Sequence, residues 1–294
     1  MKMEEKIFDT EFLKKLNNIS LKASITMNQG ASGSRKSRVK GSSVEFSDYR
    51  EYTPGDDFRR VDWNAFGRFD KLFVKLFMEE REAMVNIFID SSKSMNFGEP
   101  KKSIAALRIA SVLAFLALNN LDRVCLNSIR EGALNKSSSL MGRNMFNRCI
   151  TYLQGIEFSG RTTLCEAIKK KELTARGISI IISDFFTDGD IEEAVKYLTF
   201  KKQQVILIHL LSPEELNPEL SGELRLIDSE TGLAKNVSVT ASVLKKYNVY
   251  LNSFTKGIKE CSSKMGAAYV QVSSSDPIEK VLFEKFLGSG IISY

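Results

Sequence analysis

The chain has 294 residues, enough for one large domain or two small ones, and 43% hydrophobic and 10% aromatic residues, enough for a full core. This composition excludes an intrinsically disordered protein. The formal charge of +6 is a small excess of 42 basic over 36 acidic residues, so it indicates solubility more than a nucleic-acid partner.

The first 43 residues predict a helix followed by a basic loop. Apolar residues recur at helical spacing between residues 9 and 19. Residues 29–43 are rich in Gly and Ser, and they carry four basic side chains, Arg35, Lys36, Arg38 and Lys40. The opening residues 1–6 lack the apolar stretch of a secretory signal, so we expect a cytoplasmic protein.

Residues 44–78 predict a small β-rich subdomain. The clearest turn covers residues 53–57, and the clearest strand covers residues 72–77. Many charged residues crowd into residues 50–62, and we expect them to pair with one another inside the subdomain. Trp63 is expected in the core.

From Met84 onward the pattern alternates between strands and helices. Strands are expected at residues 84–90, 123–129, 178–184, 204–210 and 268–272, and helices at 103–119, 145–153, 164–171, 191–198, 242–264 and 277–287. Such alternation predicts a mostly parallel sheet with right-handed crossovers. Residues 104–118 are too short for a membrane span and contain Arg108, which indicates a buried amphipathic helix.

The most informative motif is Asp90-Ser91-Ser92-Lys93-Ser94, directly after the apolar strand 84–89. Alternate side chains of an extended segment point the same way, so the carboxylate of Asp90 and the hydroxyls of Ser92 and Ser94 should converge. Three oxygen donors favour a hard divalent cation, Mg²⁺, Mn²⁺ or Ca²⁺. The alternative, that Asp and Ser are ordinary turn residues after a strand, stays open.

Two later segments supply further oxygen donors. Thr162 lies in the segment 160–164 before a predicted helix, and Asp184 ends the predicted strand 178–184. Open α/β sheets bind ligands at the carboxyl ends of their strands, where these residues are expected. These segments therefore add candidate oxygen donors to those of the first motif, and the set to consider is Asp90, Ser92, Ser94, Thr162 and Asp184.

This set resembles the metal-ion-dependent adhesion site of von Willebrand factor A-type domains. A longer pattern, residues 52–63 followed by residues 73–75 and 90–95, resembles the bacterial family called domain of unknown function 58, as does the segment 215–232. Together these stretches span roughly residues 30 to 285. The resemblance implies an α/β, Rossmann-like fold of the von Willebrand factor A type, a mostly parallel sheet flanked by helices with a small β-rich subdomain.

The resemblance also implies a function. Members of the family are widespread beside MoxR-type AAA ATPases, and their A-type domain is thought to hold a partner through the metal. Ser92, Ser94 and Thr162 would be direct ligands, whereas Asp90 and Asp184 would accept hydrogen bonds from metal-bound waters. An acidic residue of the partner would fill the open coordination position. The family usually has a second Gly and an Asp around the Thr, where this chain has Arg161 and Thr163.

We therefore expect a non-enzymatic, metal-dependent protein-binding module that works with a MoxR-type AAA ATPase, with Arg161 and Lys93 contacting the partner. The expected organisation is an N-terminal helix and basic loop at 1–43, a β-rich subdomain at 44–80 plus 221–240, and an A-like domain at 81–220 plus 241–294. Two alternatives remain. One is a phosphohydrolase with Asp90 as nucleophile, although Ser92 replaces the usual second Asp. The other is nucleic-acid binding through residues 35–40, which lack aromatic platforms.

Overall fold

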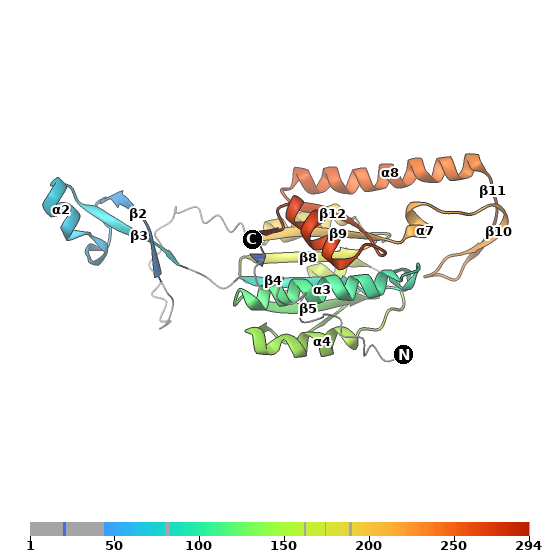
Figure 1. Ribbon diagram of the computed structural model, residues 1–294, viewed down its shortest axis with the longest axis horizontal. Coiled ribbons are helices and arrows are strands. Elements are labelled where there is room, and N and C mark those ends of the chain that lie inside the picture. Colours follow the sequence, from blue (N-terminus) through green and yellow to red (C-terminus); the bar gives the residue numbers. More distant parts are fainter. Residues whose placement is uncertain are drawn as a thin grey trace. The chain divides into compact units, whose positions relative to one another are not determined.

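The computed structural model describes residues 20–21, 44–79, 83–161, 163–173, 175–187 and 190–293 (Figure 1). These residues group into two compact units, one of residues 44–79 and one that contains residues 20–21 and 83–293. The predicted helix at 9–19 and the predicted basic loop at 29–43 lie outside the described residues.

The small unit is a two-stranded antiparallel sheet with a short helix between its strands. Strands β2 (Val44–Glu51) and β3 (Phe73–Glu79) pair, and η1 (Phe58–Arg60) and α2 (Trp63–Phe69) lie between them in the chain. The turn at 53–57 forms as predicted, because the Asp56 carboxylate accepts the Thr53 N–H at 2.9 Å and pairs with Arg50 at 2.7 Å. The expected internal pairing of charges is thus found at this turn.

Two features of the small unit differ from the prediction. Helix α2 was not predicted; it begins where Asp62 accepts the N–H groups of Asn64 and Ala65 and ends at Asp70 in the left-handed conformation. Trp63 was expected in the core but is 59% exposed. The reason is the size of the unit, since a two-stranded sheet gives a two-turn helix little apolar surface to cover it.

The large unit is built on one sheet whose strand order is β12-β9-β8-β4-β5-β6. The strands are β4 (Met84–Asp90), β5 (Arg123–Arg130), β6 (Ala133–Lys136), β8 (Gly177–Ser183), β9 (Gln203–Leu211) and β12 (Ala268–Ser273). All pair in parallel except β6 and the short β7 (Leu140–Met141), which run antiparallel to β5. In chain order this is 3-2-1-4-5-6, the doubly wound arrangement, so the predicted mostly parallel α/β fold is confirmed.

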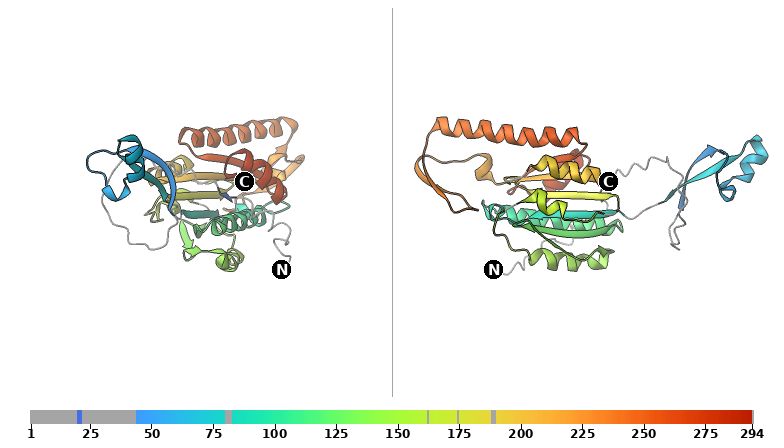
Figure 2. Two further views of the ribbon diagram at one scale, coloured as in Figure 1. Left: turned by 60° about the vertical axis from the view of Figure 1, so that its left-hand side comes forward. Right: turned by 180° about the vertical axis from the view of Figure 1, so that it is seen from behind.

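Helices cover both faces of this sheet (Figures 1 and 2). One face packs on α3 (Lys102–Asn119), α4 (Phe146–Gln154) and the π-helical η4 (Val281–Phe286), which continues α9 (Ile278–Lys280). The other packs on α5 (Leu164–Lys169), α6 (Ile191–Phe200) and α8 (Ala241–Lys264). Along β4, Ile87 and Ile89 face the first set and Phe88 the second, the period of two expected of a strand. Strands β1 (Ser20–Leu21) and β13 (Ile292–Ser293) pair antiparallel beside this core.

Helix α3 is buried as predicted, but it is apolar on nearly every side instead of amphipathic. Of its 18 residues 13 are buried, because α4 covers it where the sheet does not. Among the described helices it is also the one whose length and hydropathy would suit a bilayer, with 72% of that stretch buried inside the protein.

The hairpin formed by β10 (Gly222–Ile227) and β11 (Ala234–Val239) corrects one predicted boundary. It was assigned to the β-rich subdomain, yet its strands pair only with each other within the described part of the chain, and the hairpin belongs to the large unit. It extends from the sheet between α7 (Pro213–Leu216) and α8, which anchor its two ends (Figure 1). Tyr247 of α8 donates to the carbonyl of Glu215 at 2.7 Å and ties these anchors together.

Candidate functional site

The predicted Asp-x-Ser-x-Ser motif forms a compact loop at the carboxyl end of β4. Asp90 is fully buried, and its two carboxylate oxygens accept hydrogen bonds from the Ser92 N–H at 3.0 Å and from the Ser183 hydroxyl at 2.6 Å. The hydroxyls of Ser92 and Ser94 lie 3.0 Å apart, where the short helix η2 (Ser94–Asn96) begins. The two hydroxyls therefore converge as the spacing predicted.

Asp184 lies at the same edge of the sheet, directly after β8, which pairs in parallel with β4. It is fully buried, and one of its oxygens accepts the Phe186 N–H at 3.1 Å. Burial, and secondly the negative charge of Asp184, raise the pKa of Asp90 to about 6. The two carboxylates thus share one low-dielectric environment.

The segment that carries Thr162 flanks this loop, although Thr162 itself lies outside the described residues. The carbonyl of Gly160 accepts the Lys93 N–H at 3.0 Å, and the carbonyl of Arg161 accepts the Glu131 N–H at 2.9 Å. These bonds join the segment to the Asp90 loop and to the turn after β5. Of the five predicted ligands, four lie at this rim, and the fifth belongs to a segment bound to it.

A buried lysine at the rim was not predicted from the sequence. Lys102, the first residue of α3, is fully buried, and its Nζ lies 2.7 Å from Asp184 Oδ2 and 2.5 Å from Glu215 Oε1. The ammonium also lies 5.7 Å from the ring centroid of Phe186. One positive charge thus bridges two carboxylates from different elements.

Glu215 is held in place by the helix it belongs to. In the capping box of α7, its second carboxylate oxygen accepts the Ser212 N–H at 2.8 Å, and the Ser212 hydroxyl caps the Glu215 N–H. Burial raises the pKa of Glu215, whereas the ammonium of Lys102 acts in the opposite direction. The Ser212-x-x-Glu215 pattern was readable from the sequence as a helix start, but its link to Lys102 was not.

A cavity of about 410 Å³ opens over the rim. Ser94, Arg161, Phe186 and Glu215 line one side, and the turn of the β10–β11 hairpin, residues 227–231, lines the other. Arg161 is exposed. Hydrogen bonds from Thr231 are the largest cause of the lowered pKa of Asp228, and the charge of Arg161 is a smaller one. Lys93 is exposed as well.

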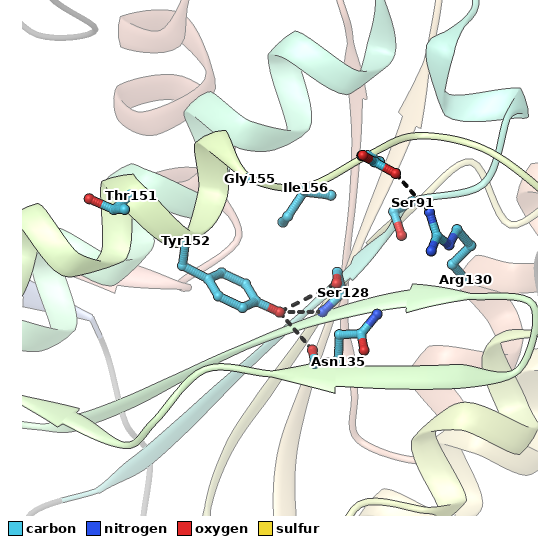
Figure 3. A pocket seen from close by; sticks show the side chains of 9 residues that line it. Ser91, Ser128, Arg130, Asn135, Thr151, Tyr152, Gly155 and Ile156 are labelled. Atoms are coloured by element: carbon cyan, nitrogen blue, oxygen red, sulfur yellow. Dashed lines mark hydrogen bonds and ion pairs between the residues drawn. The ribbon is translucent and has the colours of Figure 1, made fainter.

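The other side of the loop borders a separate cavity of about 340 Å³ (Figure 3). Ser91 points to this side and donates its hydroxyl to the carbonyl of Ile129 at 2.8 Å, away from Ser92 and Ser94. The Tyr152 hydroxyl accepts the Ser128 N–H at 3.1 Å and donates to the carbonyl of Asn135 at 2.6 Å. Because these polar groups already satisfy one another, they bind the strands together and leave few donors for a ligand.

The residues at the rim fit a hard cation by their chemistry. The donors are hydroxyl and carboxylate oxygens, and Asp90 is a buried carboxylate for which the described residues provide no ion pair. Within the same residues no cluster of three or more His, Cys, Asp or Glu side chains that could hold a metal ion is found. Lys102 already neutralises part of the charge of Asp184.

The geometry of this rim also bears on the hydrolase alternative, in which Asp90 would be the nucleophile. A nucleophilic carboxylate needs an accessible oxygen, whereas Asp90 is fully buried and both of its oxygens accept hydrogen bonds. His209, the single histidine of the chain, is a core residue of β9 whose Nδ1 lies 2.8 Å from the Tyr269 hydroxyl. It is therefore engaged in the core.

The sheet order, with helices on both faces, defines a von Willebrand factor A-like α/β domain. The family described as "Protein of unknown function DUF58" matches residues 48–252, more than half of the chain, and the chain belongs to this family. The resemblance noted in the sequence is thereby confirmed.

The chain is also similar to an uncharacterized bacterial protein and to two solved structures. The uncharacterized protein Mb1516 of Mycobacterium bovis is 26% identical over 208 residues, which are 68% of this chain and 65% of that protein, so the chain spans less than two thirds of this relative. Among solved structures, BatB from Bacteroides thetaiotaomicron has a TM-score of 0.43 at 19% identity and covers 68% of this chain and 95% of its own. The SpRpn10 VWA domain has a TM-score of 0.39 at 11% identity, with 67% and 91% covered.

Proposed function

We propose that this protein is a non-enzymatic binding module that holds a protein partner through a divalent cation at the rim of its sheet. Mg²⁺ is the preferred ion, and Mn²⁺ or Ca²⁺ would serve as alternatives. The observation that supports the proposal is the convergence of the Ser92 and Ser94 hydroxyls, 3.0 Å apart, beside the buried carboxylates of Asp90 and Asp184.

In this proposal each side chain has a separate task. Ser92, Ser94 and Thr162 would hold the ion, which supplies an electrophilic centre for a carboxylate of the partner. Asp90 fixes the loop through the Ser92 N–H, and together with Asp184 it supplies the negative charge that attracts the cation. Arg161 lines the cavity over the rim, where its guanidinium would grip an acidic partner in bidentate fashion.

The partner we propose is a MoxR-type AAA ATPase, as the family resemblance implies. This chain contains no phosphate-binding Gly-x-x-x-x-Gly-Lys-Ser/Thr loop, so any ATP-driven step would belong to the partner. We expect the complex to form in the cytoplasm. Nucleic-acid binding through residues 35–40 stays an untested alternative.

The test is capture of a purified MoxR-type ATPase by the immobilised full chain, with Mg²⁺ or with a chelator. We expect Ser94→Ala to lower Mg²⁺-dependent capture at least tenfold, because it removes a direct ligand. Ser91→Ala is the matched control from the same loop, since its hydroxyl bonds to the backbone of β5 and points away from Ser94. Arg161→Ala should weaken capture while leaving Mg²⁺ affinity at or above the wild-type value.

Two results would contradict the proposal. Capture that persists at wild-type strength in the chelator would remove the cation from the mechanism. Equal capture by the Ser94→Ala and Ser91→Ala variants would move the site away from this loop.

A further inference from the structure

Asp184, Lys102 and Glu215 form an ion triad of a carboxylate, a cation and a second carboxylate. The proposed binding mechanism uses the same three kinds of group. A carboxylate at the sheet edge contacts a cation at 2.7 Å, and the cation contacts a second carboxylate at 2.5 Å. In the proposed complex the corresponding parts would be Asp184, a divalent ion and an acidic residue of the partner. The chain therefore carries its own cation and its own carboxylate at the rim.

We propose that Lys102 is the resident cation of this site: its ammonium bridges Asp184 and Glu215 in the metal-free protein, and a divalent cation binds in competition with it. The inference rests on the proposed function, because it concerns the same rim. It adds a competitor inside the protein that sets how tightly the site holds a metal ion.

The burial of Lys102 is the first argument. The side chain is fully buried at the start of an apolar helix, where a lone ammonium would be costly, and two carboxylates offset that cost. Its neighbour Lys101 is exposed. Of these two adjacent lysines, only Lys102, which contacts the carboxylates, is buried.

The position of Glu215 is the second argument. The capping box of α7 fixes one carboxylate oxygen on the Ser212 N–H and leaves the other on Lys102. Glu215 lines the same cavity as Ser94 and Arg161, which is where a carboxylate of the partner would enter. Glu215 is therefore the in-chain occupant of that entry, held there by its own helix cap.

Competition follows from the charges. A divalent ion at Ser92 and Ser94 would be repelled by the ammonium of Lys102, and it would find one oxygen of Asp184 already bonded. Removing Lys102 would end the repulsion and free Asp184 and Glu215 at once. Both effects act in the same direction and favour the metal.

The experiment is calorimetric titration of the full chain with Mn²⁺. We expect Lys102→Met to bind Mn²⁺ at least tenfold more tightly than the wild type, and Lys101→Met, the exposed neighbour, to stay within about twofold. The double variant Lys102→Met with Glu215→Gln removes one charge of each sign and keeps the helix cap, because Gln also completes a capping box. It should fold without metal and still bind Mn²⁺ more tightly than the wild type.

Thermal unfolding gives a second measurement. Mn²⁺ should raise the melting temperature of the Lys102→Met variant by more than that of the wild type, because tighter binding to the folded state stabilises it further. The added Ser94→Ala change should abolish the tighter binding, which would locate the ion at this rim.

The results separate the two proposals. If the wild type binds Mn²⁺ at least as tightly as both Lys102 variants, the role of Lys102 is overturned, whereas the proposed metal site is not affected. An absence of Mn²⁺ binding in every variant would overturn the metal site and, with it, the competition. Equal tightening by Lys101→Met would assign the effect to net charge and overturn the specific role of Lys102.

Discussion

The carboxylate of Asp62 joins three elements of the small unit. It accepts the hydroxyl of Tyr49 from β2 at 2.8 Å, pairs with Lys75 from β3 at 3.1 Å, and caps α2 through the N–H groups of Asn64 and Ala65. These contacts favour the charged form, and the Tyr49 hydrogen bond is the largest of the causes that lower the pKa of Asp62 to about 2.

This pKa predicts how the small unit responds to acid. A lowered carboxyl pKa contributes stability that is fully present above the ordinary value of 3.8 and is lost as the pH falls through about 2. Tyr49→Phe should raise the pKa of Asp62 toward 3.8, as measured by carbon NMR titration of the full chain. Tyr52→Phe, whose ring packs on Phe58 in the same unit, should leave it unchanged. An unchanged Asp62 pKa in Tyr49→Phe would refute the assignment.

Single residues at the rim differ in how far the sequence predicted them. The hydroxyls of Ser92 and Ser94 converge as predicted, but through a turn and not through an extended strand, because Lys93 between them has a helical conformation and Ser94 begins η2. Lys102 was missed because its two partners are 82 and 113 positions away, and no local pattern encodes such distances. The available signal was a lysine in the first turn of a helix whose other charged residue is Arg108. The preceding residue, Lys101, is a second lysine and is exposed.

At the scale of elements, the loop after η2 packs closely on the start of α7. Gly98 has a φ of +90°, and a Cβ there would overlap the Cβ of Ser212, the residue that caps α7. The same loop also meets α7 at Glu99, whose N–H donates to Glu214 at 3.0 Å. The absence of a side chain at Gly98 thus lets α7, and with it Glu215, reach the rim.

We predict opposite effects for two glycine-to-alanine changes. Gly98→Ala should destabilise the protein by about 1–3 kcal/mol, because alanine is strained at this φ and overlaps Ser212. Gly257→Ala, in the interior of α8 with no atom within 4 Å of an added Cβ, should stabilise it by about 0.5–1 kcal/mol. Urea denaturation followed by circular dichroism measures both. A Gly98→Ala protein as stable as the wild type would disprove the close contact.

The sequence predicted long elements better than short ones. The strands of the parallel sheet are buried on both faces and form continuous apolar runs, which are visible without any partner. Strands β6 and β7, with four and two residues, are too short to show a period, and the seven-residue helix α2 has no buried residue. Residues 221–240 were assigned to the other unit, because the alternation of the strands β10 and β11 does not encode which elements anchor them.

At the scale of the whole molecule, the net charge and the proposed metal site favour different classes of partner. The formal charge of +6 would attract nucleic acid weakly at long range, whereas the rim offers buried carboxylates and hydroxyls suited to a cation. The two modes of binding respond differently to salt and to chelators. Release of counterions drives phosphate binding, so salt weakens it. Direct bonds between the metal ion and oxygen ligands hold a metal-bridged complex, so a chelator abolishes it.

We therefore predict how binding depends on salt. If the four basic residues 35–40 contacted four phosphates, DNA affinity would fall with a logarithmic slope of about −3.6, or about 150-fold from about 50 to 200 mM salt. Capture of the ATPase should fall far less over the same range, vanish in a chelator and return with Mg²⁺. Biolayer interferometry with the ATPase and, separately, with duplex DNA measures both. Tight DNA binding with the steep slope, and ATPase capture indifferent to the chelator, would favour the basic loop as the binding site over the metal rim.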